Sequence, residues 1–465
     1  MATVKKKNEL NTPERIEAAL IPDGEQPFST PSNWEWVTLS SISTVISKGT
    51  TPQGGKNAYL SDGVNFLRVE NICDDGTISH DNIMHVSKEM HEGFLKRSIL
   101  QENDLLISIA GTLGKTCIVR RIDLPLNTNQ AVSFSRLKEY INCKYIKLSI
   151  DNPEIQKHLL SQTKVTSIPN LTLEIIGNCP IPLAPFTEQQ RIVDRIESLF
   201  TKLDEAKEKA QAVVDGFEDR KAAILHKAFT GELTKEWRNN HPDKSWSAKP
   251  WGDFISKIEA GKNWKAEERP PKDNEFGIVK VSAVTWGSFN EYESKTCMDS
   301  SQWNPKTQIR EGDFLFSRAN TIQLVGNCVI VDQITKRLML SDKILRFSFD
   351  DSVNQYFVLY YTRSRLYRNQ VEILASGNQE GMRNISQNNL KRIQFPVPFI
   401  KEQNEIVKIL DEYLSQEHEA NEIAKTIIDQ IDIMKKSILA RAFRGELGTN
   451  DPNDESAIEL LKRIL

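Results

Sequence analysis

Two stretches of this chain are nearly identical and lie almost half a chain length apart. Residues 224–237 read ILHKAFTGELTKEW and residues 438–450 read ILARAFRGELGTN, an offset of 214 residues in a chain of 465. The same offset holds upstream without a gap, where EQQRIVDRIESLF at 188–200 matches EQNEIVKILDEYL at 402–414. Self-similarity at a fixed distance indicates that one structural unit is present twice. The chain is therefore expected to fold as two tandem copies of one unit.

Weaker matches extend the repeat toward the N-terminus, with small insertions and deletions between them. ENDLLIS at 102–108 pairs with EGDFLFS at 311–317, and NQAVSFS at 129–135 pairs with DKILRFS at 342–348. The stretches between these segments do not match. Matched framework segments with unmatched interiors are typical of one scaffold that carries two different recognition surfaces.

Each copy ends in a long heptad pattern. Apolar residues recur at alternating steps of three and four over 192–217 and again over 406–431, where Glu417 interrupts the second pattern once. Both patterns run to an ILxxAF motif and stop at Gly231 or Gly445, which are plausible C-cap glycines. About 43 residues of helix would span roughly 64 Å.

Two equal long helices favour an antiparallel pair that holds two domains apart, over a single amphipathic helix lying on a globular core. The residues expected at the helix-pair or subunit interface are Ile192, Ile196, Leu199, Leu203, Phe217, Ile406, Leu410, Tyr413, Ile427 and Ile431.

The parts before the helices are predicted to be mixed α/β domains, because short strand-like runs alternate with glycine-rich turns and helical stretches. The expected fold is α+β: two mixed α/β domains separated by a pair of long antiparallel coiled-coil helices, in a pseudo-twofold internal repeat. The predicted parts are an N-terminal arm at 1–30, a first variable domain at 31–187, a central helix at 188–233, a linker and second variable domain at 234–401, a C-terminal helix at 402–447, and a tail with a short helix at 448–465.

Composition bounds the function only loosely. Apolar residues make up 39% and charged residues 26% of the chain, which is ordinary for a soluble globular protein. No run of about 18 apolar residues exists, so no membrane span is expected. The six cysteines are scattered without a CxxC pair, and free thiols suit a reducing cytosol.

The net charge of −3 is not typical of a nucleic-acid binder, but the charge is unevenly placed. Residues 240–401 hold 23 Lys and Arg against 18 Asp and Glu, whereas residues 31–187 hold 15 of each. A neutral domain can still bind phosphate through a local patch, so charge gives only weak support to DNA binding.

No catalytic or metal-binding constellation is found. AGTLGKT at 110–116 resembles a phosphate-binding loop, but Ile109 stands where that motif needs glycine. His80, His85 and His91 lie close together, but they lack the i,i+4 spacing of a helical zinc site and have no counterparts in the second copy. The chain is therefore expected to be non-catalytic and to bind no metal.

Several of the repeated motifs together resemble the specificity subunit of type I restriction-modification enzymes. The motifs are NWEWVTLSSI at 33–42, PIPLAPFTEQQRIV at 180–193, PVPFIKEQNEIV at 396–407, and the paired ILxxAFxGEL segments. The resemblance covers almost the whole chain. The second copy departs from the first after its GEL, where GTNDPNDE replaces TKEWRNNHPD.

This resemblance implies a DNA-reading subunit that works in the cytoplasm of a bacterium or archaeon. Each variable domain would be a target-recognition domain that reads one half of a bipartite asymmetric site in double-stranded DNA. The helices would set the unread spacer and dock two modification subunits. S-adenosylmethionine, ATP and Mg²⁺ would be used by the modification and restriction subunits, and none by this chain. The alternative is a coiled-coil scaffold or adaptor that never touches nucleic acid.

Candidate DNA-contacting residues are polar residues in loops at corresponding places of the two copies. Arg, Lys, Asn and Gln read base edges in the major groove, while Lys, Arg, Ser and Thr also contact phosphates. The candidates are Lys48, Thr50, Arg68, Asn71, Thr112, Lys115, Gln130, Lys164, Asn170, Lys280, Arg318, Asn320, Lys343, Arg383 and Asn384. A further arginine run, Arg363, Arg365 and Arg368, is either a phosphate track or a solvated helix face.

Overall fold

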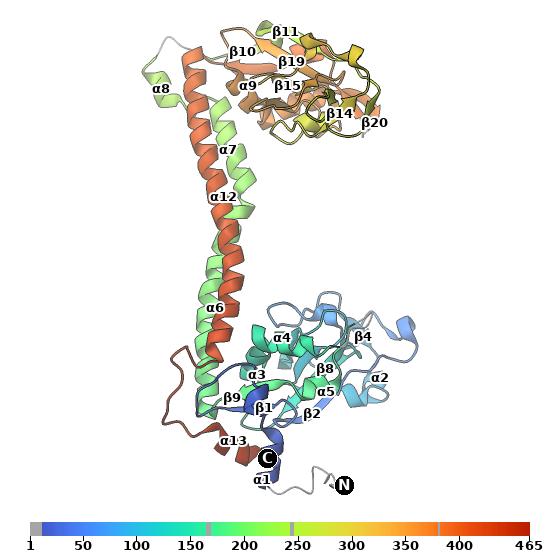
Figure 1. Ribbon diagram of the computed structural model, residues 1–465, viewed down its shortest axis with the longest axis vertical. Helices are drawn as coiled ribbons and strands as arrows, with labels where there is room; N and C mark the ends of the chain where they lie inside the picture. Colours follow the sequence, from blue (N-terminus) through green and yellow to red (C-terminus); the bar gives the residue numbers. More distant parts are fainter. Residues whose placement is uncertain (1–11, 164–168, 242–245, 380–381) are drawn as a thin grey trace. The chain divides into compact units, whose positions relative to one another are not determined.

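Figure 1 shows the computed structural model of the chain, which describes residues 12–163, 169–241, 246–379 and 382–465. The chain divides into two compact units. The first unit comprises Met1–Lys209 together with Ile427–Leu465, and the second comprises Ala210–Thr426. The C-terminal part of the chain thus folds with the N-terminal domain. The parts predicted from the sequence were consecutive segments and did not include this pairing.

The first unit is built around a four-stranded antiparallel sheet in the order β2-β8-β5-β6. These strands are β2 (Ser43–Lys48), β8 (Val132–Leu137), β5 (Leu105–Ser108) and β6 (Thr116–Ile118). A second sheet has the order β4-β3-β7, with β4 (Met84–Val86) antiparallel and β7 (Leu126–Thr128) parallel to β3 (Val64–Leu67). In addition, β1 (Glu35–Thr38) pairs with β9 (Pro180–Leu183).

Strand β5 is buried on both faces because successive side chains point to opposite sides of a strand. Leu105 and Ile107 enter the core shared with helices α3 (Cys143–Ile150) and α4 (Pro153–Ser161), while Leu106 enters the core shared with β7. The sheet is therefore the middle layer between helices and the second sheet. The short helix α5 (Leu173–Gly177) follows α4 in the chain, before β9 (Figure 1).

The second unit repeats this topology. Its central sheet has the order β11-β19-β15-β17, from β11 (Ile255–Ala260), β19 (Ile344–Phe349), β15 (Phe314–Ser317) and β17 (Cys328–Ile330). The second sheet contains β12 (Ala266–Glu267), β14 (Ser294–Cys297), β13 (Gly277–Val279) and β18 (Leu338–Met339), with β13 parallel to β18. Strands β10 (Ser247–Pro250) and β22 (Gln394–Val397) pair as β1 and β9 do. The helices are α9 (Gln355–Thr362), α10 (Arg365–Leu374) and α11 (Gln387–Lys391).

Besides strand β12, one sheet of the second unit has no counterpart among the described strands of the first. It is a three-stranded sheet in the order β16-β21-β20, formed by β16 (Ala319–Asn320), β21 (Met382–Asn384) and β20 (Ser376–Gln379). The predicted α+β repeat is confirmed, and this small sheet is the main difference between its two copies.

The long helices are α6 (Phe186–Asp215), α7 (Phe217–Phe229) and α12 (Ile400–Ala442). The sequence predicts one uninterrupted helix in each copy, but Gly216 separates α6 from α7. Helical hydrogen bonds continue across it, from Gly216 N to Ala212 O and from Arg220 N to Gly216 O. A Cβ atom on Gly216 would lie 2.6 Å from Arg220 Nη1, so glycine leaves room for this arginine, whose Nη2 donates to Val213 O.

Ion pairs show that the helices run antiparallel within each unit, as predicted. In the first unit Lys207 Nζ lies 2.8 Å from Asp432 Oδ1, and Lys435 pairs with Asp204. In the second unit Arg220 Nε lies 2.8 Å from Glu417 Oε2. Residue numbers rise along one helix as they fall along its partner, which is the signature of antiparallel pairing.

Most residues predicted for the helix-pair or subunit interface lie in the seam between the helices, but two do not. Ile192, Ile196, Ile406, Leu410 and Ile431 are buried, and Leu199, Leu203 and Phe217 are half-buried. Tyr413 and Ile427, by contrast, are 43% and 39% exposed.

The seam of α12 instead passes through Leu414, Glu417, Asn421, Ala424 and Ile428, which are buried or half-buried. Glu417 belongs to the seam because Arg220 neutralises it, and Asn421 is 5% exposed. The pattern predicted from the sequence includes Glu417, as an interruption, and Ala424. It differs from the structure where it takes Tyr413 and Ile427, each one residue before the buried or half-buried position.

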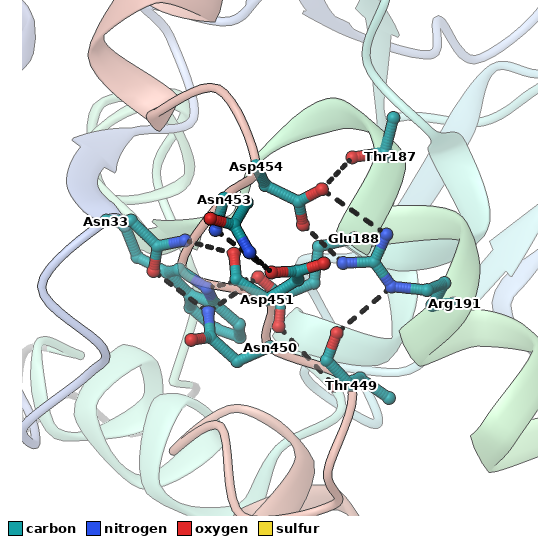
Figure 2. Close-up of polar contacts among 10 residues, drawn as sticks. Asn33, Thr187, Glu188, Arg191, Thr449, Asn450, Asp451, Asn453 and Asp454 are labelled. Atoms are coloured by element: carbon teal, nitrogen blue, oxygen red, sulfur yellow. Dashed lines mark hydrogen bonds and ion pairs between the residues drawn. The ribbon is translucent and has the colours of Figure 1, made fainter.

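The start of α6 is closed by the C-terminal tail of the chain (Figure 2). Glu188, in the first turn, is fully buried and accepts hydrogen bonds from Trp34 Nε1 (2.7 Å) and Asn450 Nδ2 (2.9 Å). Arg191 donates to Thr449 O (3.0 Å) and forms an ion pair with Asp454. Burial raises the pKa of Glu188. The tail ends in α13 (Ala457–Ile464), which adds Leu460 and Leu461 to the core.

The start of α12 is closed in the same way by the residues that follow α7. Glu402 is fully buried and accepts hydrogen bonds from Thr234 Oγ1 (2.7 Å), Arg238 Nη2 (2.8 Å) and Trp246 Nε1 (3.0 Å). This contact explains the repeated GEL segments: the segment after each helix closes onto a buried glutamate in the first turn of the other helix. The short α8 (Lys235–Asn239) carries Arg238.

None of the described helices is both long enough and apolar enough to span a membrane.

Candidate nucleic-acid interface

Four of the predicted DNA-contacting residues of the first unit meet at one edge of its sheets. Arg68 directly follows β3, and Gln130 lies just after β7. Because β3 and β7 are parallel, their carboxyl ends lie at the same edge. Lys48 ends β2, and Thr50 N donates to Thr128 O (3.1 Å) at this edge.

Gly49 makes this meeting of loops sterically feasible. Its N–H donates to Val132 O (3.0 Å), and a Cβ atom at this position would lie 2.1 Å from Asn129 O. Gly261 has the same role in the second unit, where its N–H donates to Ser341 O (3.2 Å) and a Cβ atom would lie 1.7 Å from Leu340 O. Both units therefore build the edge on the same backbone framework.

Two cations at this edge of the first unit are already paired with carboxylates. Arg68 forms an ion pair with Glu70. Lys115 Nζ lies 2.6 Å from Asp74 Oδ1 and donates to Ile72 O (3.3 Å). The exposed candidates of this unit are Lys48, Thr112, Gln130 and Asn170.

Asn71 is not part of this surface. It is 2% exposed, and its Oδ1 accepts a hydrogen bond from Arg68 N (3.0 Å), which closes the turn of residues 68–71. A buried amide that holds its own turn has no access to a base edge, and this corrects the assignment of Asn71 as a DNA-contacting residue. Lys164 lies outside the described residues.

In the second unit the small β16-β21-β20 sheet brings five predicted residues together. Arg318 N donates to Lys343 O (3.0 Å), and Ile385 N donates to Arg318 O (3.0 Å). Asn320 faces Arg383, and Ala319 faces Asn384, in the register of β16 with β21. The residues of this cluster are Arg318, Asn320, Lys343, Arg383 and Asn384.

This cluster is cationic. The three strands of the sheet, all within the described residues, carry no carboxylate. Among the described residues, no ion pair joins Arg318, Lys343 or Arg383 to a carboxylate. The Nε atom of Arg383 is buried and has no hydrogen-bond partner among the described residues. Lys280, in contrast, forms an ion pair, with its Nζ 3.6 Å from Glu268 Oε2.

The two units thus present different chemistry at equivalent places. At the edge of the first unit Arg68 and Lys115 are paired with carboxylates, whereas Arg318, Lys343 and Arg383 of the second unit have no carboxylate partner among the described residues. Anionic phosphate attracts unpaired Arg and Lys, and their planar or extended donors also read guanine. The arrangement is suited to two different segments of DNA.

One residue of this surface escaped the sequence analysis. Trp286 is exposed in a turn whose preceding residue, Thr285, accepts a hydrogen bond from Asn320 Nδ2 (3.3 Å). A signal was present in the sequence. FLRVENI at 66–72 and IVKVSAV at 278–284 are a further matching pair of the repeat, and the match ends just before Thr285 and Trp286.

The side chains that could ligate a metal ion were compared with the geometry of a metal site in the described residues. No group of three or more His, Cys, Asp or Glu in the described part of the chain could hold a metal ion. His80 Nε2 lies 3.0 Å from Asp123 Oδ1, and His91 is buried beside Asn127.

A family model for the type I restriction modification DNA specificity domain matches the chain twice, at residues 31–214 and 245–432. The chain belongs to this family. The two matches coincide with the two copies of the internal repeat. Two DNA specificity domains account for the repeat and do not fit an adaptor that avoids nucleic acid.

Relatives extend over nearly the whole chain. The EcoKI specificity subunit of Escherichia coli K12 is 22% identical over 453 residues, covering 93% of this chain and 95% of the relative. The MjaVIII specificity subunit of Methanocaldococcus jannaschii is 24% identical, covering 91% and 95%. The crystal structure of the HsdS subunit from Thermoanaerobacter tengcongensis covers 91% of this chain and 99% of its own, with a TM-score of 0.63 at 18% identity. This structural likeness shows a shared fold.

Proposed function

We propose that this specificity chain reads a bipartite asymmetric site in duplex DNA, one half-site through each unit. The observation that carries the proposal is a pair of DNA specificity domains with the same framework and different polar residues at equivalent edges. Matching frameworks place each unit on DNA in a similar way, and different side chains select different bases.

We further propose that the long helices set the unread spacer and dock modification subunits. Ile427 and Met434 lie one heptad apart in the part of α12 that belongs to the first unit, and both are exposed. Exposed large apolar side chains repeated along a helix favour a protein partner. Two modification subunits would bring S-adenosylmethionine for adenine-N6 methylation, and restriction subunits would bring ATP and Mg²⁺. A specificity subunit is the non-catalytic member of such a complex.

A domain exchange tests the proposal. Replacing residues 31–187 with the same domain of a relative that recognises a different sequence should change one half of the methylated motif and leave the other half intact. The physical reason is that base contacts lie inside each unit. Sequencing the methylated adenines in a host that carries the hybrid complex gives the motif.

The reciprocal exchange of residues 246–401 is the matched control and should change the opposite half. If both halves changed in one hybrid, the two-reader arrangement would be wrong. If the wild-type complex bound no duplex, the scaffold alternative would be favoured.

Arg383 should contribute strongly to recognition of the second half-site. Arg383→Ala is expected to weaken binding of the mapped duplex by about tenfold, since a bidentate arginine contact to a base is worth about 1–3 kcal/mol. Arg383→Lys should restore part of the affinity by keeping the charge but not the base preference.

The control for Arg383 is Arg68→Ala in the first unit, which should have a smaller effect because Glu70 already neutralises Arg68. Affinities are measured by gel shift of the assembled methyltransferase at one fixed salt concentration. Equal losses for both alanine variants would contradict the prediction.

A further inference from the structure

The turn that carries Trp286 is held rigidly by its neighbours. Asn327 Nδ2 donates to Thr285 O (2.8 Å), Asn320 Nδ2 donates to Thr285 Oγ1 (3.3 Å), and Thr285 Oγ1 donates to Val281 O (2.9 Å). On the other side, Arg363 Nη2 donates to Gly287 O (3.0 Å). Gly287 has φ +87°, a conformation that favours glycine.

The indole that this turn presents is 74% exposed. Tryptophan is ordinarily well buried, because its large apolar surface is costly to leave in water. A rigid turn that holds the indole outward therefore needs a partner that covers it. The fixed backbone also means that little conformational entropy is lost when the partner binds.

The surroundings of the indole favour a polyanion as that partner. The turn is hydrogen-bonded to Asn320, which faces Arg383 in the small sheet, and to Arg363 at the end of α9. No ion pair joins Arg363 to a carboxylate among the described residues. On duplex DNA, arginine binds phosphates and base edges, and apolar side chains contact the exposed edges of bases.

The equivalent turn of the first unit has the opposite chemistry. Lys115 Nζ donates to Ile72 O there, as Asn327 donates to Thr285 O in the second unit. The residues that follow Ile72 are Cys73, Asp74 and Asp75, and the side chain of Asp74 is 92% exposed. Asp74 pairs with Lys115, and no aromatic side chain stands at residues 73–75, so this turn of the first unit offers neither an unpaired cation nor an indole.

We propose that Trp286 is a specificity-determining residue of the second unit, which lays its indole against a base or deoxyribose of the second half-site in duplex DNA. This inference rests on the proposed DNA-reading function and adds an apolar contact to the polar cluster of the small sheet. The first unit reads its half-site without an aromatic contact at this turn.

The test uses the full chain assembled with its modification subunits and the motif mapped for the wild-type complex. Trp286→Ala should weaken binding of a duplex that contains this motif by about tenfold, because the apolar surface of the exposed indole would no longer be covered on binding. Trp286→Phe should keep most of the affinity. Methylome sequencing of the alanine variant should show relaxed recognition in the second half-site alone.

Tyr356→Ala is the matched control. Tyr356 is another exposed aromatic residue of the second unit, at the opposite end of α9 from Arg363, and its removal should leave affinity and motif unchanged. Because the indole is exposed, both Trp286 variants should unfold at the wild-type temperature.

Three results would overturn the inference while leaving the proposed function intact. The first is an alanine variant that binds and methylates as the wild type does. The second is a lowered unfolding temperature, which would assign the indole to the fold. The third is loss of co-purifying modification subunits with unchanged specificity, which would assign it to a protein contact. Failure of the wild-type complex to bind any duplex would instead refute the proposed function itself.

Discussion

Four extra residues in each long helix, inserted after Ala210 and after Ala424, should lengthen the unread spacer by about two base pairs. Both positions are buried in the seam, and each lies between the Lys207–Asp432 and Arg220–Glu417 pairs along its helix. Four helical residues add about 6 Å and about 40° of rotation. Two base pairs add about 6.8 Å and about 70°. The difference of about 30° is small enough for modest DNA twisting or domain tilting to absorb.

A seven-residue insertion at the same two places should abolish most DNA binding. It adds about 10.5 Å, close to three base pairs, but the helix turns to about −20° while the DNA turns by about 100°. Seven residues preserve the heptad seam, so this variant should still fold and assemble. Its defect should therefore appear in DNA binding and not in the unfolding temperature.

The readout for both insertions is the distance between methylated adenines on the two strands, mapped by sequencing. The single-helix insertion after Ala210 is the control, and it should fail to assemble because the partner helix no longer matches in length. An active four-residue variant with an unchanged spacer would show that something other than these helices sets the distance.

Ile196→Asp should destabilise the first unit severely. Ile196 is fully buried in the core formed with Leu439 and Phe443. Removing a buried Ile or Leu side chain costs about 2–5 kcal/mol. Aspartate adds the cost of an unpartnered carboxylate. We expect a large drop in the unfolding temperature and loss of the co-purifying modification subunits.

Ile427→Asp is the matched control, because the sequence places both isoleucines in the seam and the structure buries only Ile196. A surface substitution usually changes stability by about 0.5 kcal/mol or less. The Ile427 variant should therefore unfold near the wild-type temperature while binding modification subunits less tightly. If the two variants lowered the unfolding temperature equally, Ile427 would be buried in the seam, as the sequence predicts.

Local periodicity explains why much of the fold was predictable. The 214-residue repeat, the two heptad segments and the short alternating strands are properties of neighbouring residues, so they can be recognised without knowing any long-range contact. The polar candidates at the strand ends were also predictable as a group, because parallel strands bring their carboxyl ends together. Arg68 and Gln130 do meet in this way, after β3 and β7. Arg318, Asn320, Lys343 and Arg383 meet instead through the antiparallel β16-β21 pair and the bond from Arg318 N to Lys343 O.

The sequence by itself therefore determined the repeat, the α+β class, the long helices and the family. Only the tertiary structure decided which seam positions are buried, that Asn71 holds its own turn, that Glu70 and Asp74 pair with Arg68 and Lys115, and that Trp286 is held outward. The physical reason is that burial and charge pairing depend on groups brought together from distant parts of the chain. Arg220 makes Glu417 a seam residue from 197 positions away, and no local pattern contains that partner.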